Sequence, residues 1–208
     1  MRLQCRFTAP ILRDDLGDYV RAIEIDVLSY DEEISDTYIV GKITLNQILW
    51  SQATVDGESL FEVCDNDSQG LHDIYMILTK GKSEFRKDLA IEELFHDVMF
   101  VHRFLLHPEA QPFRVGVLEA ALMLFGEQSL AVMWMGEGDF TPAELAQLGF
   151  AKVAATTLIY RHSFNRSKFS DEHPKGLDCD LHARPEHEEW VKREWKRLVG
   201  CEADSADD

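Results

Sequence analysis

The feature that most constrains the fold of this chain is a nearly continuous apolar run at residues 98–106, VMFVHRFLL. Such a run is typical of a strand that is buried on both faces of a sheet. It ends at His107-Pro108, because proline cannot continue a central β-ladder. A second apolar segment follows at 115–125, consists mostly of good helix formers and is closed by Gly126. The sequence therefore predicts a central strand, a short turn and a helix in direct succession.

The rest of the chain alternates short β-like and helix-like segments, which favours an α/β fold. The predicted strands are residues 2–9, 19–30, 37–48, 129–135 and 152–160, of which 19–30 and 37–48 form an antiparallel hairpin. The predicted helices are residues 67–80, after an Asp67-Ser68 N-cap, and 141–149, which opens on a Thr141-Pro142-Ala143-Glu144 capping box. Residues 51–58 are predicted as a loop, and 84–95 as a short helix or a covering loop.

The sequence changes character after residue 162, so we predict an α/β domain at 1–162 and a C-terminal extension at 163–208. Residues 163–184 are polar and contain Pro174 and Gly176, which predicts a loop or lid. A final helix is predicted at 186–199, with an apolar stripe formed by Trp190, Val191, Trp195 and Leu198. The stripe either docks on the same domain or pairs with a second copy as a homodimer. The acidic tail at 202–208 is expected to fray.

Composition excludes several classes of function. The net charge of −17 repels phosphate backbones, so nucleic-acid binding is not expected, whereas a basic partner remains compatible. No apolar stretch approaches the length of a membrane helix, and residues 1–10 contain no signal-peptide core. The four cysteines form no CxxC pair, which predicts reduced thiols, a cytoplasmic location and no metal site. The polar cluster of Asp178, Cys179, Asp180 and His182, with His173 and His187 nearby, is interpreted as solvated loop.

The turn between the predicted central strand and the helix has the chemistry of a phosphate site, because the first N–H groups of a helix have no partners within the helix. Residues 111–116, Gln-Pro-Phe-Arg-Val-Gly, resemble the acyl-CoA loop of the GNAT superfamily of N-acyltransferases at Gln111 and Gly116. The order of segments downstream, including Leu148-Gly149-Phe150 before a strand, is also similar to that family. The resemblance covers about residues 18–162. It implies a GNAT-like mixed central sheet flanked by helices, to which the C-terminal helix is an extension.

The resemblance also implies a cofactor, acetyl-CoA or another acyl-CoA, and an amine acceptor, for which the acidic surface suits a cationic amine. The residues implied to hold the pyrophosphate are Gln111, Arg114, Val115, Gly116 and Val117, and those implied to offer backbone to the pantetheine arm are Phe104, Leu105 and Leu106. His102 is the candidate general base and Tyr160 the candidate general acid.

Two residues depart from the family pattern. Arg114 replaces a glycine, where its guanidinium would either pair with a phosphate or block the pocket. Leu145 stands where many members carry a tyrosine general acid, and leucine has no proton to donate. The sequence therefore leaves two hypotheses open: an N-acyltransferase, and a GNAT-like protein that has lost catalysis and acts as a binding or regulatory module.

Overall fold

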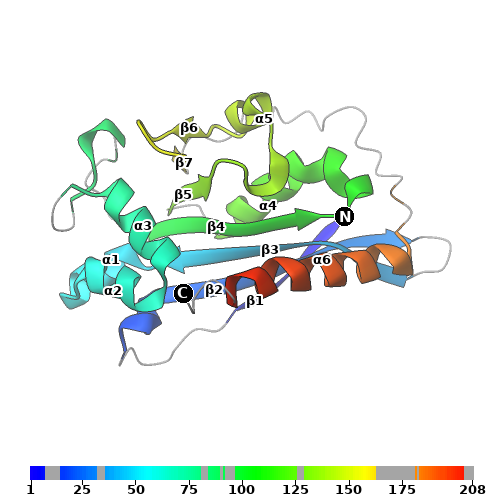
Figure 1. Cartoon of the computed structure of the whole chain (residues 1–208), viewed down its shortest axis with the longest axis horizontal. Helices are drawn as coiled ribbons and strands as arrows, with labels where there is room; N and C mark the ends of the chain where they lie inside the picture. The colour runs from blue at the N-terminus through cyan, green and yellow to red at the C-terminus, as the bar shows by residue number, and fades with distance from the viewer. Residues whose placement is uncertain are drawn as a thin grey trace.

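A computed structural model describes residues 1–7, 15–31, 36–80, 84–89, 91, 97–125, 129–162, 181 and 183–203. These residues form a mixed α/β structure with a seven-stranded sheet and six α-helices (Figure 1). The strands are β1 (Arg2–Phe7), β2 (Val20–Asp31), β3 (Asp36–Ile48), β4 (Asp97–Leu106), β5 (Ser129–Trp134), β6 (Ala151–Lys152) and β7 (Leu158–His162). The helices are α1 (Trp50–Asp56), α2 (Leu60–Asp67), α3 (Gln69–Leu78), α4 (Arg114–Phe125), α5 (Pro142–Gln147) and α6 (Pro185–Ala203).

The strand order is β1-β2-β3-β4-β5-β7-β6, and every neighbouring pair is antiparallel except β4 with β5. A parallel pair needs a crossover, and α4 supplies it between β4 and β5. The predicted central strand, the helix that begins near residue 115, and the hairpin formed by β2 and β3 are all confirmed.

Two predictions about local structure are wrong. Residues 51–58 were expected to be a loop, but most of them belong to α1, whose Trp50 and Ala53 are buried. The helix ends at Gly57, where a φ of 82° suits glycine. The predicted strand at 152–160 is divided between β6 and β7 by a tight turn that includes Ala155 at a φ of 62°. Of the segment 84–95, only Lys87–Leu89 is described as helical, as a short 3-10 turn.

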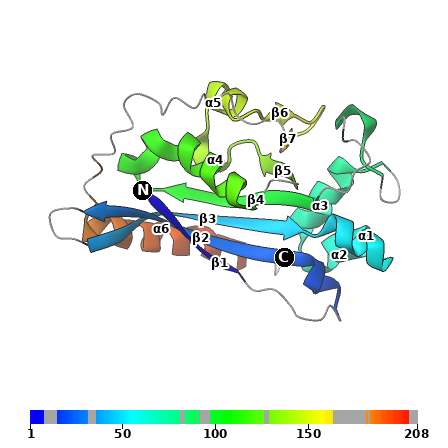
Figure 2. The ribbon, with the colours of Figure 1, turned by 180° about the vertical axis from the view of Figure 1, so that it is seen from behind.

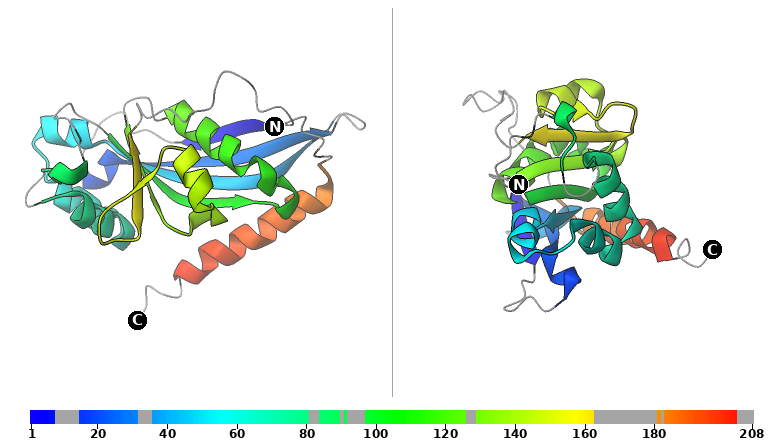
Figure 3. Two further views of the ribbon diagram at one scale, coloured as in Figure 1. Left: turned by 90° about the horizontal axis from the view of Figure 1, so that it is seen from above. Right: turned by 90° about the vertical axis from the view of Figure 1, so that its left-hand side faces the viewer.

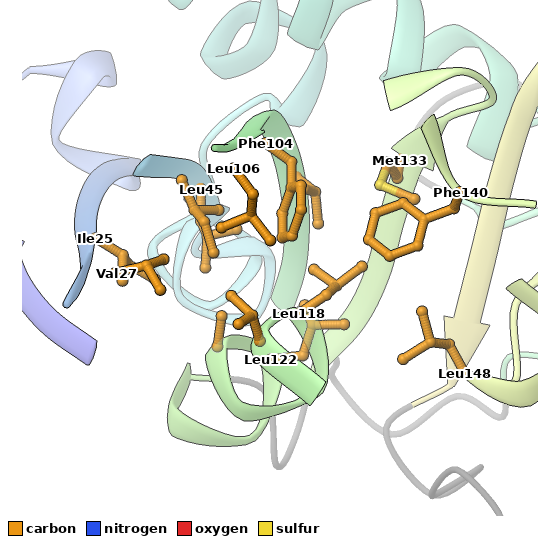
Figure 4. Close-up of a cluster of buried hydrophobic side chains, with 14 of the residues drawn as sticks. Ile25, Val27, Leu45, Phe104, Leu106, Leu118, Leu122, Met133, Phe140 and Leu148 are labelled. Atoms are coloured by element: carbon orange, nitrogen blue, oxygen red, sulfur yellow. The ribbon is translucent and has the colours of Figure 1, made fainter. Parts of the chain in front are cut away.

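The sheet separates two apolar cores. Helices α4 and α5 cover one face, where Leu118 and Leu122 pack on strands β2 to β5 (Figures 2 and 4). Helices α1 to α3 cover one end of the opposite face, over Phe100 and Val132. Helix α6 lies on β3 and on the opposite side of the sheet from α4 (Figure 3, left). Its Val191 is fully buried and Trp195 lies 5.9 Å from the Lys42 ammonium, so the predicted apolar stripe packs on its own chain.

The ladder of β4 is irregular where the functional residues were predicted. On its β3 side the register skips one residue, because Leu45 pairs with Val101 and Thr44 with Arg103, so that His102 is a β-bulge. On its β5 side, pairing stops at Val101 and Met133. Strand β5 ends one residue later, at Trp134, while β4 continues to Leu106, and a 3-10 turn at Glu137–Asp139 lies beside β4.

Candidate functional site

The central feature of the candidate site is the last part of β4, beyond Val101, where no described strand pairs with it on the β5 side; we call this gap in the strand pairing the opening. Ligands of α/β sheets bind where neighbouring strands part at their carboxyl ends, and here α4 starts beside the same end of β4. The backbone N–H of Phe104 points into the opening and donates a hydrogen bond to Glu137 Oε1 at 2.6 Å. One of the three residues implied to contact the pantetheine arm therefore presents its backbone at the opening, and that donor is already bonded to the chain's own carboxylate.

Aromatic side chains fill the α4 side of this opening. Phe140 points toward Phe104 across the space between β4 and β5, with ring centroids 5.1 Å apart (Figure 4). Gly138 lies between them at a φ of 68°, and a Cβ there would stand 2.6 Å from Phe140 and 2.7 Å from Phe104. Position 138 therefore requires glycine both for its backbone conformation and for space.

Arg114 is held by neighbouring side chains rather than facing open space. Its Nε and Nη2 donate to the two carboxylate oxygens of Glu144 at 3.0 and 2.7 Å, and its Nη1 donates to Gln111 Oε1 at 3.2 Å. The Arg114 hydrogen bonds, with those from Thr141, lower the pKa of Glu144 to about 2. Gln111 in turn donates from Nε2 to the carbonyl of Leu106 at 3.2 Å. Arg114 thus braces the start of α4 against α5, a role that the sequence did not indicate.

Gly116 and Val117 lie apart from this chain of contacts. Both line a groove of about 820 Å³ between α4 and β1, together with Arg2, Leu3 and Ala120. A Cβ added at Gly116 would meet nothing within 4 Å. The half-buried Val115 packs against the core under α4. The structure therefore brings Phe104, Leu106, Gln111 and Arg114 together and places Gly116 on the far side of the helix.

His102 and Tyr160 project from the same face of the sheet, the one covered by α1 to α3. The His102 ring packs edge-on against Phe100, and Tyr160 packs against the same core cluster from β7. Strand β5 lies between their two strands, which separates the strand axes by about 10 Å. The two candidates can face one bound substrate from two sides, but they do not form an adjacent acid–base pair.

Asp67 is a member of the His102 environment that the sequence analysis missed. Burial raises the pKa of Asp67, while a hydrogen bond from Ser68 and the charge of His102 lower it. We expected Asp67 to share the N-cap of the following helix, but Ser68 alone caps α3, and Asp67 ends α2 instead. Nearby, burial and the Asp67 charge raise the pKa of the Cys64 thiol to about 12, so it is no nucleophile at neutral pH.

Leu145 is buried in the core under α4 and α5. Position 145 therefore supplies packing and no general acid. The late-loop residues His173, Asp178, Cys179, Asp180 and His182 lie outside the described residues. His187 is described, and it belongs to a different cluster.

That cluster, which we call the histidine clasp, consists of His107, Glu109 and His187, whose ligand-type atoms lie within 4.8 Å of one another. It joins the end of β4 to the start of α6. His107 Nδ1 accepts from the Glu109 N–H at 3.3 Å, and His187 Nδ1 accepts from the Arg184 N–H at 3.2 Å. In the neutral form of each ring, the proton is therefore on Nε2, and His187 Nε2 lies 3.3 Å from Glu109 Oε2. This pattern describes a hydrogen-bonded clasp, since a metal at Nε2 needs the opposite tautomer.

The clasp makes folding stability depend on pH. Burial and the neighbouring His187 lower the pKa of His107, and Glu109 opposes them in part. Because the folded-state pKa lies below the unfolded value of about 6.5, the stabilisation is complete above that pH and is lost as the pH falls through the folded-state pKa. We expect urea unfolding between pH 8 and 5 to show a smaller loss of stability in His107→Asn, which keeps the acceptor but cannot titrate. His72→Asn is the control, and an equal pH dependence in all three proteins would contradict the prediction.

Comparison of the chain with protein-family models, curated proteins and solved structures finds no significant match. In the described parts of the chain, no helix is both long enough and apolar enough to cross a lipid bilayer.

Proposed function

We propose that this protein is a cytoplasmic GNAT-type N-acyltransferase that transfers an acyl group from acetyl-CoA or a related acyl-CoA to an amine. The observation that carries the proposal is that β4–β5 pairing ends at Val101 and Met133 while β4 continues to Leu106, with α4 starting soon after. The opening supplies a backbone donor, the Phe104 N–H, for the pantetheine arm. The start of α4 supplies a positive dipole end for the pyrophosphate, and the first N–H of the helix, that of Arg114, is bonded to the Gln111 carbonyl.

The proposed reaction is direct transfer. The amine nitrogen attacks the thioester carbonyl carbon, the carbon–sulfur bond breaks, and CoA leaves as a thiolate. His102 takes the proton that the amine loses, and Tyr160 or water protonates the thiolate. His102 lies on the α1–α3 face, whereas Phe104 lies on the α4 face. The amine would therefore approach from one face of the sheet and the acyl-CoA from the other. The net charge of −17 favours a cationic acceptor.

Two contacts favour the second candidate, a GNAT-like module without catalysis. Glu137 accepts the hydrogen bond of the Phe104 N–H, and Glu144 binds the Arg114 guanidinium through both of its oxygens. Both donors would have to exchange partners before they could bind acyl-CoA. The two candidates differ in whether that exchange takes place.

Calorimetric titration with CoA tests the exchange. We expect Glu137→Gln to bind CoA about ten- to a hundredfold more tightly than the wild type, because a charge-assisted hydrogen bond worth about 1.5–3 kcal/mol no longer competes for the Phe104 N–H. Asp139→Asn is the matched control, since it removes a neighbouring acid and suits the positive φ at that position. It should leave the affinity near that of the wild type.

A parallel titration with pantetheine separates the two halves of the proposed site. CoA should bind more tightly than pantetheine, because only CoA carries the pyrophosphate. Absence of CoA binding in the wild type and in Glu137→Gln, together with no transfer from acetyl-CoA to a panel of polyamines and lysine peptides, would reject the acyltransferase. Binding without transfer would favour the non-catalytic module.

A further inference from the structure

Helix α4 has an apolar outer face, which is unusual for a helix on the surface of a soluble protein. Its only charged residue beyond Arg114 is Glu119, which is buried and paired with Arg161. The residues that face outward form what we call the α4 stripe: Gly116, Ala120, Met123 and Leu124. Met123 and Leu124 are 57% and 58% exposed. The inner face of α4 also packs on the sheet through apolar side chains, so the helix is apolar on both faces.

We propose that the α4 stripe is the interface of a homodimer with two-fold symmetry, in which the α4 helices of two copies pack antiparallel. A two-fold interface must be self-complementary, so that a residue meets its partner in both directions. The α4 stripe meets this condition. The stripe has a hollow at Gly116, where an added Cβ would have no heavy atom within 4 Å. Eight residues later, the exposed Leu124 protrudes from the helix.

An axis through Ala120 places Leu124 of each copy over Gly116 of the other. The two Ala120 methyl groups then meet at the axis, where their small size lets the helices approach closely. The repeat of eight residues corresponds to about 12 Å of helix. Because the axis passes through Ala120, one substitution at position 120 changes both helices at the centre of the contact.

The groove beside α4 extends the interface beyond the helix. A specific dimer needs about 800 Å² of buried surface on each partner, and a 12 Å stripe on one helix supplies only part of that area. The α4 stripe continues into β1, because Met1 and Leu3 line the same groove of about 820 Å³. Phe7 at the other end of β1 is 54% exposed and lies against Phe125 of α4. These side chains add apolar surface beside the α4 stripe, although the Arg21 guanidinium lies 5.6 Å from the centre of the Phe7 ring.

The distribution of charge favours this face over the rest of the surface as the place where a second copy binds. A chain with a net charge of −17 repels another copy of itself over most orientations. Of the described residues that line the groove, Arg2 is the only charged one, and it is basic. The α4 stripe is thus a place where two copies can meet without opposing their acids. The inference does not depend on the proposed enzymatic function.

The oligomeric state of the full-length chain tests the proposal. Sedimentation equilibrium of the wild type should give twice the chain mass of 23.9 kDa. Leu124→Lys should give the single mass, because two buried ammonium groups would face apolar hollows. Met76→Lys is the matched control: Met76 is also 57% exposed but lies on α3. It should remain dimeric.

Cross-linking reports on the axis itself. Under mild oxidation, Ala120→Cys should form a disulfide-linked dimer far beyond the wild-type background, whereas Met76→Cys should not. A monomeric wild type whose Ala120→Cys variant does not cross-link overturns the proposal. A dimer that persists in Leu124→Lys also overturns the proposal. A monomer that retains an apolar small molecule in this groove overturns it as well. None of these variants alters Gly116, so their results stay separate from tests of acyl-CoA binding.

Discussion

Replacement of Glu119 by alanine is expected to lower the free energy of unfolding by about 3–5 kcal/mol, because it leaves a buried guanidinium without a partner. Glu119 of α4 and Arg161 of β7 form a bidentate ion pair, and the two residues are only 9% and 4% exposed. The pair connects α4, which crosses over between β4 and β5, to β7, the strand on the other side of β5 from β4. Chemical denaturation with a two-state fit measures the loss.

The control uses a bidentate pair of the same chemistry at the surface. Arg86 donates from Nε and Nη2 to the two oxygens of Asp88, and both side chains are partly exposed. Asp88→Ala should therefore cost far less than Glu119→Ala. The double variant Glu119→Leu with Arg161→Met should recover most of the lost stability, since it leaves no charge unpaired. Equal losses in Glu119→Ala and Asp88→Ala would contradict the expected burial effect.

Replacement of His102 by alanine is expected to reduce the rate of acyl transfer by about 10²–10⁴-fold, the usual contribution of a general base. CoA affinity should not change, because the ring lies on the α1–α3 face and the residues proposed to contact the pantetheine arm and the pyrophosphate lie toward α4. The fold should survive, at a cost of about 1–3 kcal/mol. Transfer from acetyl-CoA to a cationic amine, followed by release of the thiol, provides the assay.

Three further variants make this test specific. His72→Ala, on the surface of α3, should leave the rate unchanged. Asp67→Asn should move the acidic limb of the pH–rate profile to lower pH, since it removes a negative charge near the imidazole. Tyr160→Phe removes only a hydroxyl and so measures the acid role separately. A rate in His102→Ala equal to that of the wild type removes His102 from the mechanism.

The fold was predictable where a local pattern determines the structure. Residues 98–106 are apolar on both faces because β4 lies in the middle of the sheet, and that pattern needs no knowledge of distant residues. Helix α1 was missed because its sequence, WSQATVD, contains few apolar residues, and only Trp50 and Ala53 turn inward. The division of the segment at 152–160 depends on a turn at Ala155, a residue type that carries no turn signal of its own.

The candidate site was less predictable, because its contacts join distant segments. Chemistry alone singled out His102, but the carboxylate that acts on it, Asp67, lies 35 positions earlier. The Glu137 carboxylate that binds the Phe104 N–H lies 33 positions later. Spacing in the sequence contains no signal for either contact. The position of Gly116 toward β1 likewise follows from the rotation of α4 on the sheet, which the loop motif does not specify.

The bond between Arg114 and Glu144 has a consequence for how this loop could change during evolution. Glu144 accepts hydrogen bonds from the Thr141 N–H at the cap of α5 and from the Arg114 guanidinium, with the same oxygen serving both. A glycine at position 114 would remove one partner of a carboxylate that also holds the α5 cap. The effects of substitutions at 114 and 144 are therefore non-additive. A change at either position alone loses the stability that the pair provides, so Arg114 and Glu144 constrain each other's substitution during evolution.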